Sequence, residues 1–297
     1  MKNALMVGYL QSWGSSNITF TEAVKRGYTT PVMAFGEINR SEVGIYGGAF
    51  APSPTPEELK KDIQGAKENG AEQVLFSVGG GNNTYCPKNA DVVTLAQNIV
   101  AYLSEYGFTG IDFDLELSCD KNDQVYLDQL CAEIKKLDES LIITAAPQLN
   151  QADHGSNLFL VSQGNDNIFE IAVANNRFDY LFVQAYNNGW PEVNGCKETD
   201  VCFISAAFNN LKNTIPSATK IVIGEPANNK AAGTSIFPKS DVPSDIYERI
   251  AKQYSSIHAD EQFGGAMCWS VNLDESNDYS FVNAVGPVID SSVPSLV

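Results

Sequence analysis

The chain has 297 residues, of which 43% are hydrophobic, and its 36 Asp and Glu outnumber its 19 Lys and Arg, giving a net charge of −17. This is ordinary globular composition, and a chain of this length can bury a large core without disulfide staples. The acid excess excludes nucleic acid and anionic membrane surfaces as partners, since both are bound by basic patches. No run approaches the roughly 20 apolar residues that span a bilayer, so we expect no membrane segment.

Short apolar segments rich in Val, Ile, Phe and Tyr recur along the chain and predict eight β-strands. In chain order they cover residues 5–11, 30–35, 73–78, 110–116, 141–147, 180–186, 220–224 and 265–270. Their spacing of roughly 25–45 residues is the scale of one strand–helix unit. The pattern therefore predicts an α/β protein in which strands and helices alternate.

Amphipathic stretches between these strands predict helices. The first begins with Thr-Pro-Glu-Glu at residues 55–58, a capping box with proline at the first helical position, and ends near Gly70. The second carries apolar residues at helical spacing from Val92 to Leu103 and stops at Gly107. A third covers residues 127–137, and two later segments, 203–214 and 244–256, are further candidates.

No linker, charge block or low-complexity run divides the chain, so we expect one domain over residues 1–297. Eight alternating units in one domain favour a single (β/α)8 TIM barrel. A doubly wound sheet is the alternative. Its dinucleotide-binding form is disfavoured, because no GxGxxG follows the first strand.

Cysteines and histidines are few. The close spacing of Cys196 and Cys202 is compatible with a disulfide inside a loop. With only His154 and His258, zinc ligation is not expected. We predict no metal and no cofactor.

The most informative segment is Gly-Ile-Asp-Phe-Asp-Leu-Glu-Leu at residues 110–117. Side chains of a strand alternate between its faces, so Asp112, Asp114 and Glu116 share one face and the apolar residues share the other. In a barrel the apolar face packs against the helices, and the three acids point into the interior. Adjacent acids then lie about 7 Å apart at Cα, close enough to influence each other.

Three readings of this face are open. A buried ion-pair cluster lacks partners, because the other predicted strands contain no Arg or His and only Lys220 at one edge. An edge strand with its acids in water fits the alternation equally well. The functional reading is a proton held on Glu116 at neutral pH by Asp114 and Asp112, at the carboxyl end of the strand where barrel active sites open. Such an acid can protonate a glycosidic leaving oxygen.

At this point the sequence resembles glycoside hydrolase family 18, the chitinase family, and within it the hevamine-like (class III) type. The family signature DGxDxDxE corresponds to residues 109–116, with Thr109 in place of the first Asp. Four further motifs follow the family in order: Ser-Val-Gly-Gly at 77–80, Thr-Ala-Ala-Pro-Gln at 144–148, Val-Gln-Ala-Tyr-Asn-Asn at 183–188, and Gly-Gly-Ala-Met-Cys-Trp-Ser at 264–270.

The resemblance implies a role for each matching residue. Glu116 is expected to be the general acid and then the base, Asp114 to orient the substrate's N-acetyl group, and Asp112 to tune Asp114. Tyr186 is expected to donate a hydrogen bond to the acetamido oxygen, and Trp269 to form the floor under the reacting sugar. Other expected substrate contacts, or contacts to the acid network, are Tyr9, Phe35, Gln148, Gln184, Asn187 and Trp190.

Further expectations follow from the same resemblance. Trp13 and Trp190 follow the first and sixth strands, on the rim that carries Glu116, where sugar rings could stack. Non-proline cis peptide bonds are expected at Ala34-Phe35 and Trp269-Ser270. Thr109, in place of the family's Asp, is expected to affect the tuning of the acid network more than catalysis itself. About 40 residues separate the seventh and eighth strands, enough for a loop and a helix, so no large α+β insertion is expected.

The function implied is that of a retaining endo-chitinase acting on β-1,4-linked N-acetylglucosamine, in polysaccharide degradation. Its expected partners are chitin and N-acetylglucosamine oligosaccharides, and the protein is expected to be a monomer. An endo-β-N-acetylglucosaminidase of N-glycans and a non-catalytic lectin or inhibitor are the alternatives. Secretion is expected because these substrates lie outside the cytoplasm, although no signal peptide is read in this chain.

Overall fold

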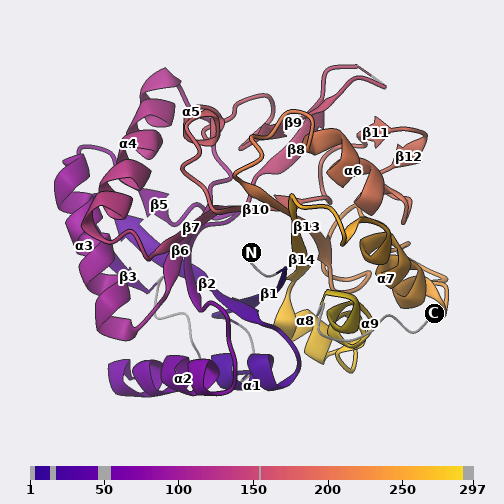
Figure 1. Ribbon diagram of the computed structural model, residues 1–297, viewed down its shortest axis with the longest axis horizontal. Coiled ribbons are helices and arrows are strands. Elements are labelled where there is room, and N and C mark those ends of the chain that lie inside the picture. Colours follow the sequence, from indigo (N-terminus) through magenta and orange to yellow (C-terminus); the bar gives the residue numbers. More distant parts are fainter. Residues whose placement is uncertain (1–3, 14–17, 46–54, 154, 290–297) are drawn as a thin grey trace.

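A computed structural model describes residues 4–13, 18–45, 55–153 and 155–289. Eight parallel strands form a closed ring, because β1 pairs with both β14 and β2. The ring runs in the order β1, β2, β4, β6, β7, β10, β13 and β14. Figure 1 looks along this ring, with the helices outside it. The expected (β/α)8 barrel is confirmed.

The barrel strands follow the predicted apolar segments. Their bounds are β1 Leu5–Gln11, β2 Thr30–Asn39, β4 Leu75–Gly79, β6 Gly110–Asp114, β7 Ile142–Ala145, β10 Tyr180–Gln184, β13 Lys220–Pro226 and β14 Phe263–Trp269. Several ends differ from the prediction. In particular, β6 ends at Asp114, because its pairing stops at the register of Gly79 on β4 and Ala145 on β7. Glu116 therefore lies just beyond the strand.

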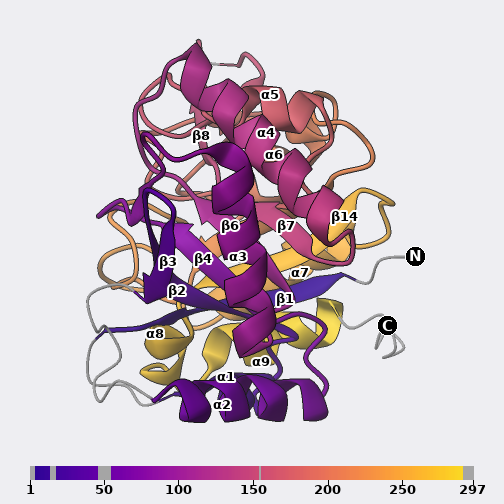
Figure 2. The same ribbon diagram turned by 90° about the vertical axis from the view of Figure 1, so that its left-hand side faces the viewer.

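Helices cover the outside of the ring. Their bounds are α1 Phe20–Lys25, α2 Pro56–Glu68, α3 Val92–Tyr106, α4 Lys121–Leu137, α5 Glu170–Ala174, α6 Phe203–Leu211, α7 Ile246–Ile257, α8 Val271–Glu275 and α9 Ser280–Ile289. The capping box at Thr55 and the left-handed Gly107 bound α2 and α3 as predicted. In the side view, α3 and α4 lie side by side across β4 and β6, so they cover the outer face of the strand that carries the acids (Figure 2).

Shorter strands lie outside the ring of eight, in the segments that connect barrel strands and helices. β3 Glu42–Ile45 and β5 Tyr85–Cys86 extend the sheet beside β2. β8 Gln148–Gln151 pairs with β9 Leu158–Val161, and β11 Glu192–Val193 pairs with β12 Cys196–Lys197. Between β13 and β14, residues 227–262 contain α7 as their regular element, so the barrel carries no large α+β insertion there.

The core has two layers because strand side chains alternate. Outward residues such as Ile111 and Phe113 on β6 pack beneath the helices and are fully buried. Inward residues such as Val7, Val32 and Phe182 fill the interior of the barrel. Asp112 and Asp114 fall on the inward face, as the alternation predicted. The edge-strand alternative is wrong, because β6 is paired on both sides.

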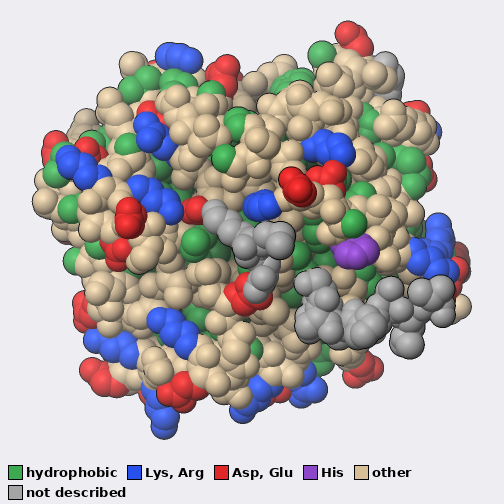
Figure 3. Space-filling view, viewed as in Figure 1, with side chains coloured by type: hydrophobic (Ala, Val, Ile, Leu, Met, Phe, Trp, Pro, Cys, Tyr) green, Lys and Arg blue, Asp and Glu red, His purple; other side chains and the backbone are tan. Residues whose placement is uncertain are grey.

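Charge is spread over the surface. On the face shown in Figure 3, Asp and Glu side chains are interspersed with Lys and Arg, without a large field of one sign. Among the described residues, no helix is long and apolar enough to cross a membrane.

Candidate active site

Asp112 is the innermost of the three acids and is fully buried. The parallel register places Ser77 of β4 and Thr144 of β7 on either side of it. Their hydroxyls donate hydrogen bonds of 2.6 Å to its two carboxyl oxygens, and the Tyr9 hydroxyl donates a third at 2.8 Å. Burial raises the pKa of Asp112, and the three donors oppose that rise because they stabilise the anion.

Asp114 is the middle acid and is only 5% exposed. The side-chain amide of Gln184 on β10 donates to its Oδ1 at 2.9 Å and also to the carbonyl oxygen of Ala146 at 3.0 Å. Burial raises the pKa of Asp114 well above its usual value, and the charges of Glu116 and Asp112 raise it further. This middle carboxyl is therefore the one whose anion is most disfavoured.

Glu116 lies at the mouth of the site and is half-buried. Gln148, the first residue of β8, donates a hydrogen bond of 2.9 Å from its amide to Oε2 of Glu116. Burial raises the pKa of Glu116, and the amide of Gln184 opposes the rise. The sequence predicted a proton held on Glu116 by Asp114 and Asp112. The geometry raises the pKa of both Asp114 and Glu116: Asp114 is buried with an acid on each side, and Glu116 is half-buried.

The backbone beside these acids is close-packed. Gly79 ends β4 with φ +119°, and a Cβ there would lie 1.8 Å from the carbonyl oxygen of Asp114. The amide of Gly80 donates to that same oxygen at 2.6 Å. Only glycine permits this approach, so Gly79 of the Ser-Val-Gly-Gly motif has a structural role here.

The acids open into a cavity of about 580 Å³. Aromatic rings form one side of it: Phe35 stacks on Trp269 with centroids 6.1 Å apart, and Trp13 stacks on Phe35 at 6.0 Å. The Tyr186 side chain also lines the cavity. Its hydroxyl has no hydrogen-bond partner among the described residues, so it can serve a ligand. The peptide bonds Ala34-Phe35 and Trp269-Ser270 are cis, as expected.

Most of the predicted site residues meet in this cavity. Its lining consists of Trp13, Phe35, Gly81, Asn82, Thr84, Asp114, Glu116, Gln148, Gln184, Tyr186, Asn187 and Trp269. Tyr9 and Asp112 lie behind it, joined by their hydrogen bond. Trp190 lines a different cavity. Asn82 and Thr84 were not predicted. The glycine-rich turn after the third strand is the signal that could have indicated them.

Asp112, Asp114 and Glu116 form an acid ladder, and a further buried carboxyl outside this ladder was not predicted from the sequence. Glu198 is fully buried, and it accepts hydrogen bonds from the Thr234 hydroxyl at 2.6 Å and the Asn188 amide at 2.9 Å. Asn187, which lines the cavity, accepts from the amides of Gly233 and Thr234 at 2.7 and 2.9 Å. These bonds join the segment after β10 to the segment after β13.

The described residues contain no group of three or more His, Cys, Asp or Glu placed to hold a metal ion. For chemistry, the site offers an acid near solvent, two buried acids behind it that each accept hydrogen bonds from neighbouring side chains, the Tyr186 hydroxyl and an aromatic wall. This set suits acid–base chemistry on a ring-shaped, polar substrate.

Comparison with known proteins agrees with this geometry. The family model for glycosyl hydrolases family 18 matches residues 5–241. A basic endochitinase of Nicotiana tabacum is 27% identical over 266 residues, covering 83% of this chain and 78% of that protein. A crystal structure of a putative chitinase A from Streptomyces coelicolor has a TM-score of 0.74 at 22% identity, covering 97% of this chain and 98% of that one.

The same fold also occurs in a xylanase and α-amylase inhibitor protein from Scadoxus multiflorus. Its TM-score is 0.63 at 20% identity, with 95% of this chain and 98% of that chain covered. Structural similarity at this level of sequence identity establishes the fold only, and the activity has to be argued from the residues of the site. The family model, in contrast, matches residues 5–241, most of the chain, and this range contains Asp112, Asp114 and Glu116. This chain belongs to the glycosyl hydrolases family 18.

Proposed function

We propose that this protein is a retaining endo-chitinase that hydrolyses β-1,4-linked N-acetylglucosamine polymers. The observation that carries the proposal is the half-buried Glu116 carboxyl, with a raised pKa, at the mouth of an aromatic-walled cavity. Asp114 and Asp112 lie in line behind it. An acid of this kind is what protonation of a glycosidic oxygen requires.

In the proposed reaction, Glu116 donates its proton to the glycosidic oxygen while the C1–O bond breaks. The carbonyl oxygen of the substrate's own N-acetyl group attacks C1 from the other face and forms a cyclic oxazolinium ion. Asp114 orients the acetamido group and stabilises its positive charge, and the Tyr186 hydroxyl donates to the acetamido oxygen. Substrate-assisted hydrolysis of this type is a recognised alternative to a carboxylate nucleophile.

Water completes the reaction. The Glu116 carboxylate removes a proton from a water molecule, which attacks C1 and reopens the ring. Two inversions at C1 give net retention. Trp269 and Phe35 provide a flat apolar surface for the sugar at the cleavage site, and Asp112, fixed by three hydroxyl donors, keeps Asp114 in place.

Cleavage inside the chain is supported by the shape of the fold. The segment between β13 and β14 has α7 as its regular element and no inserted domain. An inserted domain would add a wall to the substrate groove. Without that wall the groove is open at its ends, so a long polymer can lie across it. We also propose that the protein is secreted, since its polymeric substrate lies outside the cytoplasm, and that it acts as a monomer.

The test is hydrolysis of a fluorogenic chitotrioside from pH 4 to 8 by the wild type, Glu116→Gln and Glu139→Gln. Glu139 is exposed and follows α4, so it is the control for the same chemical change. We expect turnover to collapse only in Glu116→Gln. Equal loss in both variants, or full activity in Glu116→Gln, would contradict the assignment of the acid.

Two further measurements separate the alternatives. Proton NMR of the first product from an N-acetylglucosamine hexamer should show the β-anomer, and an initial α-anomer would exclude retention. Release of glycans from a high-mannose glycopeptide, with no cleavage of chitin, would identify an endo-β-N-acetylglucosaminidase. Binding of chito-oligosaccharide without any turnover would identify a lectin.

A further inference from the structure

The turn that follows β4, from Gly79 to Thr84, lies beside the acid ladder. Thr84 lines the active-site cavity, and its side chain is only 5% exposed. A buried threonine at the edge of a cavity can direct its hydroxyl to a ligand or to the protein itself. The hydrogen bonds of Thr84 show that its hydroxyl is committed to the protein.

The Thr84 hydroxyl closes the turn. It accepts a hydrogen bond of 2.7 Å from the amide of Gly79 and donates one of 2.9 Å to the carbonyl oxygen of the same residue. The Thr84 amide donates to that carbonyl oxygen as well, at 3.1 Å. Thr84 therefore holds both polar groups of Gly79, and two of these three bonds need the hydroxyl.

Backbone preference alone does not close this turn. Asn83 has φ +46°, in the left-handed region that residues with a Cβ rarely adopt, although asparagine tolerates it better than most. Such conformations persist where the surrounding structure fixes them. The hydroxyl of Thr84 supplies part of that fixation, so the turn is expected to relax when the hydroxyl is removed.

Asp114 depends on this turn for the position of its main chain. It is the last residue of β6, and its pairing with Gly79 is the last between β4 and β6. On the other side of β6, pairing with β7 ends one residue earlier, at Phe113 and Ala145. The carbonyl oxygen of Asp114 accepts a hydrogen bond of 2.6 Å from the amide of Gly80, inside the turn.

The far end of the turn is anchored independently of the acids. The amide of Ile38 on β2 donates to the carbonyl oxygen of Thr84 at 2.7 Å. The ring of Tyr85 packs edge-on against Phe113, with centroids 6.0 Å apart. Because Thr84 is held on this side, opening the turn moves its other end, and that end contains the Gly80 amide that binds Asp114.

We propose that Thr84 is a positioning residue for catalysis: its hydroxyl fixes the turn that holds the main chain of Asp114, and thereby the direction of the Asp114 carboxyl toward the N-acetyl group of the substrate. The inference rests on the proposed function for the role of Asp114. Gln184 holds the Asp114 side chain from β10 at 2.9 Å, and Thr84 holds its backbone from the end of β4. The two residues together determine where the carboxyl lies.

The experiment measures kcat and KM of the wild type and of Thr84 variants on chitohexaose, the N-acetylglucosamine hexamer. Thr84→Val keeps the shape of the side chain and removes the hydroxyl, whereas Thr84→Ser keeps the hydroxyl. We expect Thr84→Val to lower kcat about 10- to 100-fold with little change in KM, because a misplaced reacting group affects the chemical step. Thr84→Ser should restore most of kcat.

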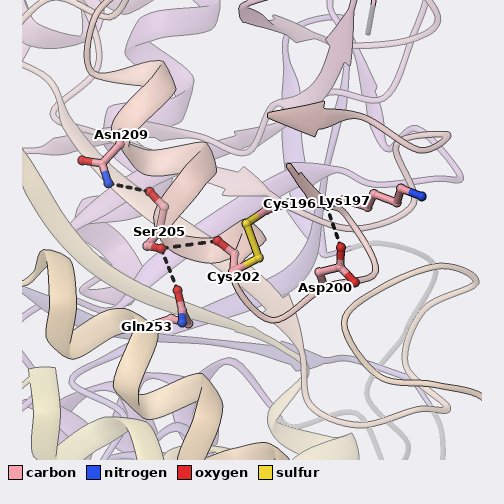
Figure 4. The surroundings of a disulfide bond; sticks show 7 residues. All are labelled: Cys196, Lys197, Asp200, Cys202, Ser205, Asn209 and Gln253. Carbon is pink, nitrogen blue, oxygen red and sulfur yellow. Dashed lines mark hydrogen bonds between the residues drawn. A yellow bond between two sulfur atoms is a disulfide. The ribbon is translucent and has the colours of Figure 1, made fainter. Parts of the chain in front are cut away.

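The control removes a hydroxyl that lies outside the acid ladder. Ser205 of α6 donates to the Gln253 side chain of α7 at 2.6 Å, next to the disulfide that joins Cys196 to Cys202 (Figure 4). Ser205→Ala should lower the urea midpoint, as Thr84→Val should, and leave kcat unchanged. Circular dichroism shows whether each variant is folded in the assay. If Thr84→Val does not fold, Thr84→Cys takes its place, since a thiol is a weak donor and acceptor, and it should also lose kcat.

Full kcat in Thr84→Val, or in Thr84→Cys where that variant is used, would overturn the inference. So would a raised KM with unchanged kcat, because Thr84 would then act only as part of the cavity wall. An equal loss of kcat in Ser205→Ala, or a loss that Thr84→Ser does not restore, would assign the effect to packing and also overturn it. A wild type without turnover would reject the proposed function and this inference with it, whereas an active wild type with an equally active Thr84→Val rejects this inference alone.

Discussion

The hydroxyl of Tyr9 on β1 donates a hydrogen bond of 2.8 Å to Oδ2 of Asp112 on β6, across the interior of the barrel. Both groups are buried, so neither can exchange this partner for water. The bond fixes the innermost carboxyl from a strand that is distant in the sequence, and it makes Tyr9 a positioning residue for the acid ladder.

Replacing Tyr9 by Phe removes this donor and leaves a buried carboxyl oxygen with one hydroxyl fewer. We expect a loss of about 1.5–3 kcal/mol in the free energy of unfolding, the scale of one hydrogen bond to a charged group. We also expect kcat for the chitotrioside to fall about 10- to 100-fold, the scale of effect that misplaced reacting groups produce.

The matched control for this prediction is Tyr28→Phe. Tyr28 is also fully buried, and its hydroxyl donates at 2.6 Å to Asp274, a carboxyl outside the cavity. Urea denaturation should show a similar loss of stability for both variants, whereas only Tyr9→Phe should lose kcat. If Tyr28→Phe loses as much kcat, the effect of Tyr9 is general destabilisation.

The pH dependence of activity should respond to Asp112. Catalysis needs a proton at the mouth of the ladder, so activity persists at low pH and is lost as the pH rises through the raised pKa of Asp114 and Glu116. The Asp112 charge is one cause of the raised pKa of Asp114. Asp112→Asn removes that charge and should move the upper limb of the kcat/KM profile to lower pH, with kcat also reduced.

Profiles of kcat/KM from pH 4 to 9 on the fluorogenic chitotrioside would measure this shift. Asp274→Asn serves as the control, since Asp274 is a buried carboxyl bound to Tyr28 and to the amides of α9. An upper limb that stays in place in Asp112→Asn would mean that the two acids do not interact as their geometry indicates.

The barrel could be predicted from the sequence because each strand is a short apolar segment that is recognisable without its neighbours. Alternating Asp and apolar residues on β6 placed the acids inside and the apolar side chains under α3 and α4. Strand ends were less predictable, since they depend on where neighbouring strands stop pairing. For that reason Glu116 lies beyond β6 and not within it.

The site residues that could be predicted from the sequence are those that lie in a recognisable motif. Glu198 has no local signature: its importance comes from hydrogen bonds to Asn188 and to Thr234, which is 36 residues away. Trp190 was expected on the rim that carries Glu116; its backbone is left-handed, and its side chain lines a different cavity from the acids. The reliance of both residues on loop conformation explains why sequence patterns could not position them.

Glu225 on β13 should make the protein less stable as the pH rises. It is fully buried, neither of its carboxyl oxygens has a partner among the described residues, and burial with the nearby Glu198 charge raises its pKa well above the usual value. The folded state then holds a proton that the unfolded state has released. Its stabilising contribution is complete below the unfolded pKa and is lost as the pH rises through the folded pKa.

Glu225→Gln cannot titrate, so its free energy of unfolding should fall less between pH 5 and pH 8 than that of the wild type. Urea denaturation at both pH values gives the two slopes, and the exposed Glu139→Gln should keep the slope of the wild type. Identical pH slopes for Glu225→Gln and the wild type would show that Glu225 is ionised in the folded protein.

Glu198, Thr234 and Asn187 form a hydrogen-bonded wall that joins the segments after β10 and β13, and this wall should control substrate affinity. Thr234→Val removes the hydroxyl that donates to the buried Glu198 at 2.6 Å, while the backbone amide of residue 234 still reaches Asn187. The loosened wall should raise KM for the chitohexaose several-fold and change kcat little, because Asn187 borders the cavity but lies apart from the acid ladder. The free energy of unfolding should fall by about 1–3 kcal/mol, since a buried charged acceptor loses one of its donors.

Thr219→Val is the matched control. Thr219 is also fully buried, and its hydroxyl donates at 3.0 Å to the carbonyl oxygen of Phe178, just before β13 and β10 begin. This variant should lose stability without a change in KM. A KM that rises equally in both variants would assign the effect to the barrel as a whole, whereas a rise confined to Thr234→Val places it in the Glu198–Thr234–Asn187 wall.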